Sequence, residues 1–176
     1  MFRTIFNTIV RADRAACIKI SGLNGRSTMD RIMRLISRYG DGYLYPLFGL
    51  LIFVFDRSSA RIVVPAALVA FPAEILTQLG LKFTFRRRRP CLVIPEVKSL
   101  VSLPEDFGFP SGHTAGAFLL ATLMAHVYPV LLIPGYVIGL IVGLSRVYNG
   151  VHYPGDIVVG AFLGIGAARL SLVILF

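Results

Sequence analysis

Long apolar runs separated by short polar segments make up the chain from about residue 43 onward. Five runs cover residues 43–55, 62–81, 114–128, 130–144 and 157–176. A helix needs about 20 apolar residues to cross the hydrocarbon core of a bilayer, and only the second and fifth runs reach that length, so the others need flanking turns. The pattern predicts an all-α, polytopic membrane helix bundle with about five transmembrane helices in residues 41–176.

The first 40 residues follow a different, amphipathic pattern. Apolar residues recur at helical spacing at Phe2, Ile5, Phe6, Ile9 and Val10, and polar residues occupy the other side at Arg3, Asn7, Arg11 and Arg14. A second stripe lies between residues 29 and 36, opposite three arginines. These stripes are typical of helices lying in a membrane interface, so we expect residues 1–40 to form basic amphipathic interfacial helices. Packing of the same stripes on protein is an equal alternative.

Glycine pairs at a spacing of four residues occur in three of the predicted helices. They are Gly112/Gly116, Gly139/Gly143 and Gly160/Gly164. Small residues at this spacing let helix backbones approach closely inside a membrane. The pairs predict one compact bundle.

The composition excludes soluble, disordered and fibrous proteins. Of the 176 residues, 56% are apolar and 15% charged, against about 25% charged in a typical soluble domain. The net charge is +9; on so apolar a chain we expect it to meet the lipid bilayer or a phosphate, not nucleic acid. Cys17 and Cys91 lie far apart without a CxxC motif, so we assign them no metal and no disulfide.

Two polar segments interrupt the apolar half of the chain, at residues 82–112 and 145–156. Two predicted helices lie between them, so both segments emerge on one face of the membrane. Together they supply cations, a helix start, two imidazoles and a carboxylate. The residues are Lys82, Arg89, Ser111, Gly112, His113, Arg146, His152 and Asp156.

This set of residues has the chemistry of a phosphate site. Ser111 and the backbone N–H groups that follow it begin an apolar helix, and helix N-termini bind oxyanions, while the three cations would neutralise the phosphate oxygens. Asp156 can hold one ring nitrogen of His152 protonated and leave the other free to attack phosphorus. His113 is then the acid for the leaving oxygen.

Three motifs give these residues a family resemblance. KFTFRRRRP fits Lys, six residues, Arg-Pro; PSGH occurs literally; SRVYNGVHYPGD fits Ser-Arg, five residues, His, three residues, Asp. In this order they resemble the type 2 phosphatidic acid phosphatase superfamily, membrane lipid-phosphate phosphatases related to vanadium haloperoxidases. The resemblance covers residues 62–176. That family usually has six core helices, so the first helix is expected to be absent or replaced here.

The resemblance implies a mechanism without metal or cofactor. His152 is the nucleophile that forms a phosphohistidine, Asp156 is its partner and His113 is the general acid. The phosphate-binding residues it implies are Lys82, Arg89, Ser111, Gly112 and Arg146. Two other classes remain open on the residues alone: a non-enzymatic lipid-phosphate transporter or binder, and a metal-dependent hydrolase using the two histidines and Asp156.

Several polar residues lie outside these motifs. Glu74, Gln78 and Lys82 fall at intervals of four, so they share one helix face, and we expect Glu74 and Gln78 to support Lys82 from a second shell. Arg86, Arg87 and Arg88 are equally consistent with headgroup anchors and with contacts to a second phosphate. Arg169, inside the last apolar run, has no assigned partner.

Orientation and substrate follow from charge and from the resemblance. The basic N-terminus shares the catalytic face, which on the positive-inside rule alone would be cytoplasmic. Bacterial members of the family usually work at the periplasmic face of the inner membrane, and we follow the family. Its bacterial substrates include lipid A 1-phosphate, phosphatidylglycerophosphate, undecaprenyl diphosphate and phosphatidate, and the arginine cluster favours the first two. The oligomeric state is not predicted.

Overall fold

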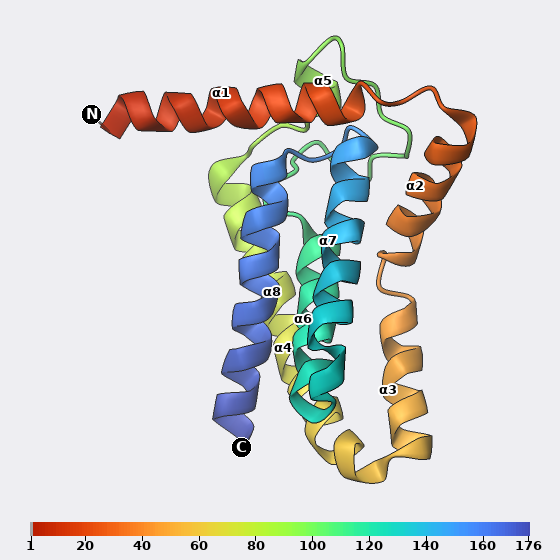
Figure 1. Ribbon diagram of the computed structural model, residues 1–176. Helices are drawn as coiled ribbons and strands as arrows, with labels where there is room; N and C mark the ends of the chain where they lie inside the picture. Colours follow the sequence, from red (N-terminus) through yellow and green to blue (C-terminus); the bar gives the residue numbers. More distant parts are fainter. Residues whose placement is uncertain (1) are drawn as a thin grey trace.

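The computed structural model describes residues 2–176, except the side chains of Phe2, Arg3, Ile5 and Phe6, which include part of the predicted N-terminal stripe. The described chain is all-α, as predicted (Figure 1). Its helices are α1 (Phe2–Ser21), α2 (Ser27–Tyr39), α3 (Leu44–Phe55), α4 (Arg57–Phe85), α5 (Pro90–Val93), α6 (Gly112–Val127), the 3₁₀ turn η1 (Pro129–Leu131), α7 (Leu132–Tyr148) and α8 (Pro154–Leu175).

Three segments of the described chain are long and apolar enough to cross a membrane. They are Arg57–Phe85, Pro129–Tyr148 and Pro154–Leu175. The run at 130–144 therefore does gain flanking residues, as predicted, because η1 continues into α7. The helices of the other two short runs stay short: α3 has 12 residues, and α6, which starts two residues before its run, has 16. α3 ends where Asp56 caps α4 by accepting a hydrogen bond from the Ser59 N–H.

The long helices pack around α6, which contacts α4, α7 and α8 (Figure 1). The predicted close approach of helix backbones is confirmed for the Gly160/Gly164 pair, whereas a Cβ on a glycine of the other two pairs would meet side chains. A Cβ on Gly164 would collide with the carbonyl oxygen of Ala115, and one on Gly160 with that of Ser111. These glycines let α8 lie directly against the start of α6, which brings the two polar segments together.

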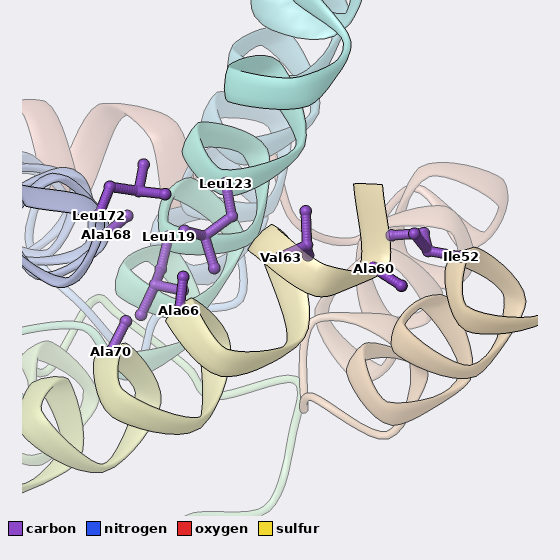
Figure 2. Packing of buried hydrophobic residues seen from close by; sticks show 9 residues of the cluster. All are labelled: Ile52, Ala60, Val63, Ala66, Ala70, Leu119, Leu123, Ala168 and Leu172. Atoms are coloured by element: carbon purple, nitrogen blue, oxygen red, sulfur yellow. The ribbon is translucent and has the colours of Figure 1, made fainter. Parts of the chain in front are cut away.

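A core of small and branched side chains joins α3, α4, α6 and α8 (Figure 2). Its buried members are Ile52, Ala60, Val63, Ala66, Ala70, Leu119, Leu123, Ala168 and Leu172. The outer surface of the helices is also apolar, with exposed Leu, Ile, Val and Phe side chains along α3, α4, α7 and α8. An apolar exterior around a tightly packed interior is what a bilayer requires.

The two N-terminal helices differ in their packing. α1 runs across one end of the bundle (Figure 1), and its Ile9 and Val10 are exposed. α2 packs on α7. It buries polar Asp30 and Ser37 and exposes Met29. Ile32 of the predicted stripe is exposed as well, whereas Met33 and Ile36 are half-buried, so part of the stripe packs on the protein.

Candidate active site

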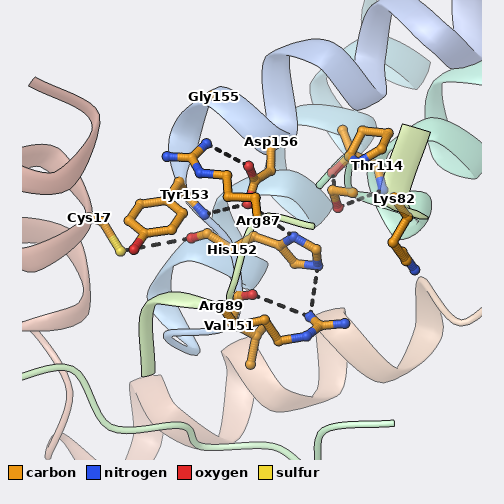
Figure 3. A network of polar contacts seen from close by, with 12 residues as sticks. Cys17, Lys82, Arg87, Arg89, Thr114, Val151, His152, Tyr153, Gly155 and Asp156 are labelled. Atoms are coloured by element: carbon orange, nitrogen blue, oxygen red, sulfur yellow. Dashed lines mark hydrogen bonds and ion pairs between the residues drawn. The ribbon is translucent and has the colours of Figure 1, made fainter. Parts of the chain in front are cut away.

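The first part of the site is the imidazole–carboxylate pair at the start of α8. Pro154 begins the helix, and the Asp156 carboxylate turns back to accept a hydrogen bond from the Tyr153 N–H at 2.9 Å. This capping arrangement fixes the carboxylate. His152 Nδ1 lies 3.5 Å from Asp156 Oδ2, and both residues are buried, 3% and 0% exposed. The sequence-predicted pair is thus brought together in space (Figure 3).

The other ring nitrogen of His152 faces a guanidinium group. Arg89 Nη1 lies 3.2 Å from His152 Nε2 and also donates to the Val151 carbonyl oxygen. Arginine only donates, so Nε2 is the acceptor and the ring proton is on Nδ1, which faces Asp156 but has no hydrogen-bond partner among the described residues. Burial, and then the charges of Arg146 and Arg89, hold the pKa of His152 well below its ordinary value. The imidazole is therefore neutral at neutral pH, with the Nε2 lone pair directed at Arg89.

Arg87 links this pair to α1. α4 is followed by its C-cap residue Arg86, which has a left-handed backbone conformation. The chain then continues in an extended form, with Arg88 bridged to Phe107 and Arg89 extended, so the side chains of residues 87–89 alternate in direction. Arg86 and Arg88 are exposed. Arg87 turns inward, where it donates to Asp156 Oδ1 at 2.7 Å and Asp13 Oδ2 at 2.6 Å. Arg87 therefore contacts Asp156. The sequence had suggested either a headgroup anchor or a contact to a second phosphate.

Asp13 completes this connection. Its second oxygen accepts a hydrogen bond from the Gly155 N–H at the start of α8, at 2.7 Å. Arg87 also lies over the Tyr153 ring, 3.9 Å from the ring centre. Sequence reasoning missed Asp13, although it is the only acidic residue before Asp30.

The cations Lys82 and Arg89 share a second carboxylate that sequence reasoning missed. The Lys82 ammonium group pairs with Glu105, whose Oε1 is also 3.8 Å from Arg89 Nη2. Lys82 and Arg89 are buried, whereas the Glu105 side chain is 39% exposed. Glu105 therefore lies on the open side of the site, where an anionic ligand would compete with it for both cations.

The start of α6 lies beside the pair. Ser111 caps the helix by accepting from Thr114, and its own N–H donates to the Asp156 carbonyl oxygen at 3.1 Å. The Ser111 hydroxyl is thus a helix cap as well as a phosphate-binding candidate. Buried Arg146 donates to Ser37, and its Nε has no partner among the described residues. An anion at this point would satisfy that N–H group.

His113 faces the opposite side of the site, where its Nε2 pairs with Asp41 from the α2–α3 connection. A cavity of about 550 Å³ adjoins it. Gln78 and buried Glu74 line this cavity, and Gln78 Nε2 lies 3.5 Å from the Pro110 carbonyl oxygen. Glu74 and Gln78 were predicted to support Lys82 from the same helix face. The Lys82 ammonium group pairs with Glu105 instead.

Two further sequence observations concern the remaining polar groups. Arg169 is exposed at the far end of the bundle beside a cavity of about 240 Å³ that His126 also lines, away from the site. Cys17 and Cys91 are both free. Within the described part of the chain, His, Cys, Asp and Glu do not form a group of three that could hold a metal ion.

A family model describes most of this chain. Residues 48–176 match the model of the PAP2 superfamily. The match includes every predicted motif and begins earlier than the resemblance from residue 62. The undecaprenyl-diphosphatase of Sulfolobus acidocaldarius is 29% identical over 159 residues, which are 88% of this chain and 74% of that protein.

Two solved structures have the same fold. LpxE of Aquifex aeolicus superposes with a TM-score of 0.78 at 27% identity, covering 90% of this chain and 93% of that one. The transmembrane PAP2-type phosphatidylglycerolphosphate phosphatase of Bacillus subtilis superposes with a TM-score of 0.76 at 26% identity, covering 96% and 86%. The predicted membrane helix bundle is therefore a transmembrane PAP2 fold.

Proposed function

The chain belongs to the PAP2 superfamily and is a multi-pass membrane lipid-phosphate phosphatase; on this premise we propose that His152 takes the phosphoryl group from a lipid-anchored phosphate ester or diphosphate. One observation carries the proposal. Nε2 of a neutral His152 points toward Arg89, while Nδ1 faces Asp156. Asp156 thus faces one ring nitrogen of the imidazole, and the lone pair on the other, Nε2, points toward the cations that would hold the phosphate.

The reaction proceeds in two steps. Nε2 attacks phosphorus, the bond to the leaving oxygen breaks, and His113 supplies the proton that the leaving alkoxide needs. The phosphohistidine is then cleaved by a water molecule, from which His113 takes back a proton. Lys82, Arg89 and Arg146, with Ser111 and Gly112 at the start of α6, hold the phosphate oxygens. No step uses a metal ion.

The lipid chains have room beside α3. One apolar cavity of about 590 Å³ lies between α3 and α4, and a second of about 560 Å³ lies between α3 and helices α6 and α7. Tyr45 lines both of these cavities and the polar cavity next to His113. A lipid can thus keep its chains in apolar surroundings while its phosphate lies at His152.

We assign α3 and α6 to two further membrane crossings, which makes five, with the site at the periplasmic face of a bacterial inner membrane. Labelling tests this orientation. We would introduce Ser102→Cys, at an exposed position of the 82–112 segment, together with Cys91→Ser. Reaction with an impermeant thiol reagent in intact cells is expected; labelling only after lysis would reverse the assignment.

The activity test measures phosphate release by the detergent-purified protein in the presence of EDTA. The panel is phosphatidylglycerophosphate, lipid A 1-phosphate, undecaprenyl diphosphate and phosphatidate, the first two being favoured. We expect release that EDTA does not reduce and that His152→Ala abolishes. His126→Ala is the matched control, because that imidazole is exposed at the other end of α6.

Two results would contradict the proposal. Activity retained in His152→Ala would exclude the phosphohistidine, and loss of wild-type activity with EDTA would indicate a metal-dependent reaction. Trapping of a phosphorylated protein in wild type quenched with alkaline detergent, absent from His152→Ala, would support the intermediate directly. Phosphohistidine has a P–N bond that is labile in acid and stable in alkali, so the samples are kept alkaline during analysis.

A further inference from the structure

The cavity beside His113 is lined by hydrogen-bonding groups that have no partner among the described residues. Glu74 is only 3% exposed, yet its Oε1 has no hydrogen-bond partner in the described part of the chain. The Tyr45 hydroxyl, whose oxygen is also buried, likewise has none there. A buried polar group without a partner costs free energy. Two such groups on one cavity indicate that a ligand supplies the missing bonds.

Two glycines at the start of α6 leave room for side chains that line the cavity. A Cβ on Gly116 would lie 2.9 Å from the Tyr45 ring, and one on Gly112 would lie 2.6 Å from Gln78 Nε2. Any larger residue at either position would displace the side chain opposite. Phe71 stacks against Tyr45 with ring centres 5.1 Å apart, which fixes the ring from its other side.

The position of the cavity identifies which part of the substrate enters it. His113 lines the cavity and lies at the start of α6, next to Gly112, where the phosphate is proposed to bind. In the mechanism proposed above, His113 protonates the leaving oxygen, so the leaving alcohol begins at His113 and extends into this space. Beyond it, Tyr45 and Phe71 lead to the apolar cavity along α3, where the hydrocarbon chains fit.

We infer that Glu74 and Tyr45 bind a free hydroxyl group of the leaving alcohol, so that the substrate is a lipid whose phosphate is carried on a polyol with a free hydroxyl group beside it, as in phosphatidylglycerophosphate and unlike phosphatidate. A carboxyl group hydrogen-bonds a hydroxyl whether or not it is ionised, and a phenol both donates and accepts. A polyprenyl diphosphate offers no hydroxyl group here and would leave both groups unsatisfied. This inference rests on the proposed function and specifies its substrate.

The test compares two lipids that differ by one hydroxyl group. They are phosphatidylglycerophosphate and an analogue in which propane-1,3-diol replaces the terminal glycerol. We expect the wild type to prefer the natural lipid by about tenfold in kcat/KM, as for a site that hydrogen-bonds a substrate hydroxyl. Glu74→Leu should remove most of this preference, and Tyr45→Phe should reduce it.

The ratio of the two kcat/KM values does not depend on how much of a preparation is folded, so a destabilised variant remains informative. Leu76→Ala, on the exposed side of the same helix, is the matched control and should keep the preference. A wild type without preference, or a preference unchanged in Glu74→Leu, would overturn the inference.

Undecaprenyl diphosphate separates this inference from the proposed function. If the wild type hydrolyses that lipid faster than phosphatidylglycerophosphate, the hydroxyl site is wrong and the phosphatase stands. If EDTA-resistant phosphate release occurs from none of the lipids, the proposed function fails, and this inference fails with it.

Discussion

The buried carboxylates on the two sides of the site are paired very differently. On the nucleophile side, Asp156 accepts from the Tyr153 N–H and from Arg87, and Arg87 is held in turn by Asp13. On the leaving-group side, Glu74 and Tyr45 face a cavity with partners missing among the described residues.

This difference separates what the protein organises in advance from what it leaves to the substrate. The phosphoryl group is the same in every lipid phosphate, so a rigid nucleophile and fixed cations suit them all. The alcohol differs between lipids, and unsatisfied groups make discrimination possible there. Substitutions on the nucleophile side should therefore reduce turnover of every lipid, and those around the cavity should change the relative rates.

The largest effect after loss of His152 itself is expected for Asp156→Asn. The amide is nearly the same size but can present its NH₂ group to His152, which favours the wrong tautomer. By analogy with other carboxylate–imidazole pairs we expect kcat to fall by roughly 10³-fold or more, equally for all substrates. Single-turnover phosphorylation measures this step. A loss confined to one lipid would break the distinction between the two sides.

Arg87→Ala tests whether the preorganisation extends to α1. Without the guanidinium, Asp156 loses its 2.7 Å partner and Asp13 loses its link to the site. We expect kcat to fall by about 10²-fold, the scale of a catalytic group displaced by about 1 Å, with little change in KM.

The double variant Asp13→Asn/Arg87→Ala is the control for coupling. If the two residues act as one unit, the double variant loses little more than Arg87→Ala alone. Arg88→Ala, a neighbouring but exposed cation, should have a small effect. A large and purely additive loss from Asp13→Asn would show that α1 acts separately from Arg87.

How much of the site could be predicted from the sequence depends on how far apart the contacting residues lie along the chain. His152 and Asp156 form part of a motif of fixed length, so their pairing was predictable. Arg87 and Asp13 are 74 residues apart, and their contact depends on where α1 crosses the bundle. The inward direction of Arg87 follows from the extended conformation after α4, two residues before Arg89. That alternation was the available signal.

The lengths of the helices could also be predicted from the sequence only in part. The apolar run at 130–144 was predicted to gain flanking residues, and it did so because η1 is continuous with α7. The run at 43–55 could not lengthen, because Asp56 begins the next helix at once. The resulting cavities on either side of α3 depend on how that helix stands in the bundle, which hydropathy does not encode.

The pH dependence of kcat/KM tests the neutral state of His152. Its lowered pKa arises from burial and from Arg146 and Arg89, with a smaller contribution from Lys82. Imidazole attacks only when neutral, so activity is lost as pH falls through that pKa, below the ordinary value of about 6.5. We expect the acid limb of the profile well under pH 6.5. A limb at or above that value would contradict the geometry.

Arg146→Gln sharpens this prediction. Removing one positive charge should move the acid limb upward, whatever the variant does to the absolute rate, because kcat/KM reports ionisations of the free enzyme and substrate. The ionisation of the substrate phosphate is measured separately and subtracted. An unchanged limb in Arg146→Gln would assign it to a group other than His152.

The smallest effect is expected at Glu105, which lies between the two sides. Its carboxylate pairs with Lys82 and approaches Arg89 at 3.8 Å, so an incoming phosphate must compete with it. Because the side chain is 39% exposed, solvent screens the pairing, and Glu105→Gln should lower KM and the inhibition constant of inorganic phosphate by only about threefold. Glu96→Gln, exposed in the same segment, is the control. If Glu105→Gln raises KM instead, Glu105 positions Lys82, and the preorganised side of the site extends to the solvent-facing segment before α6.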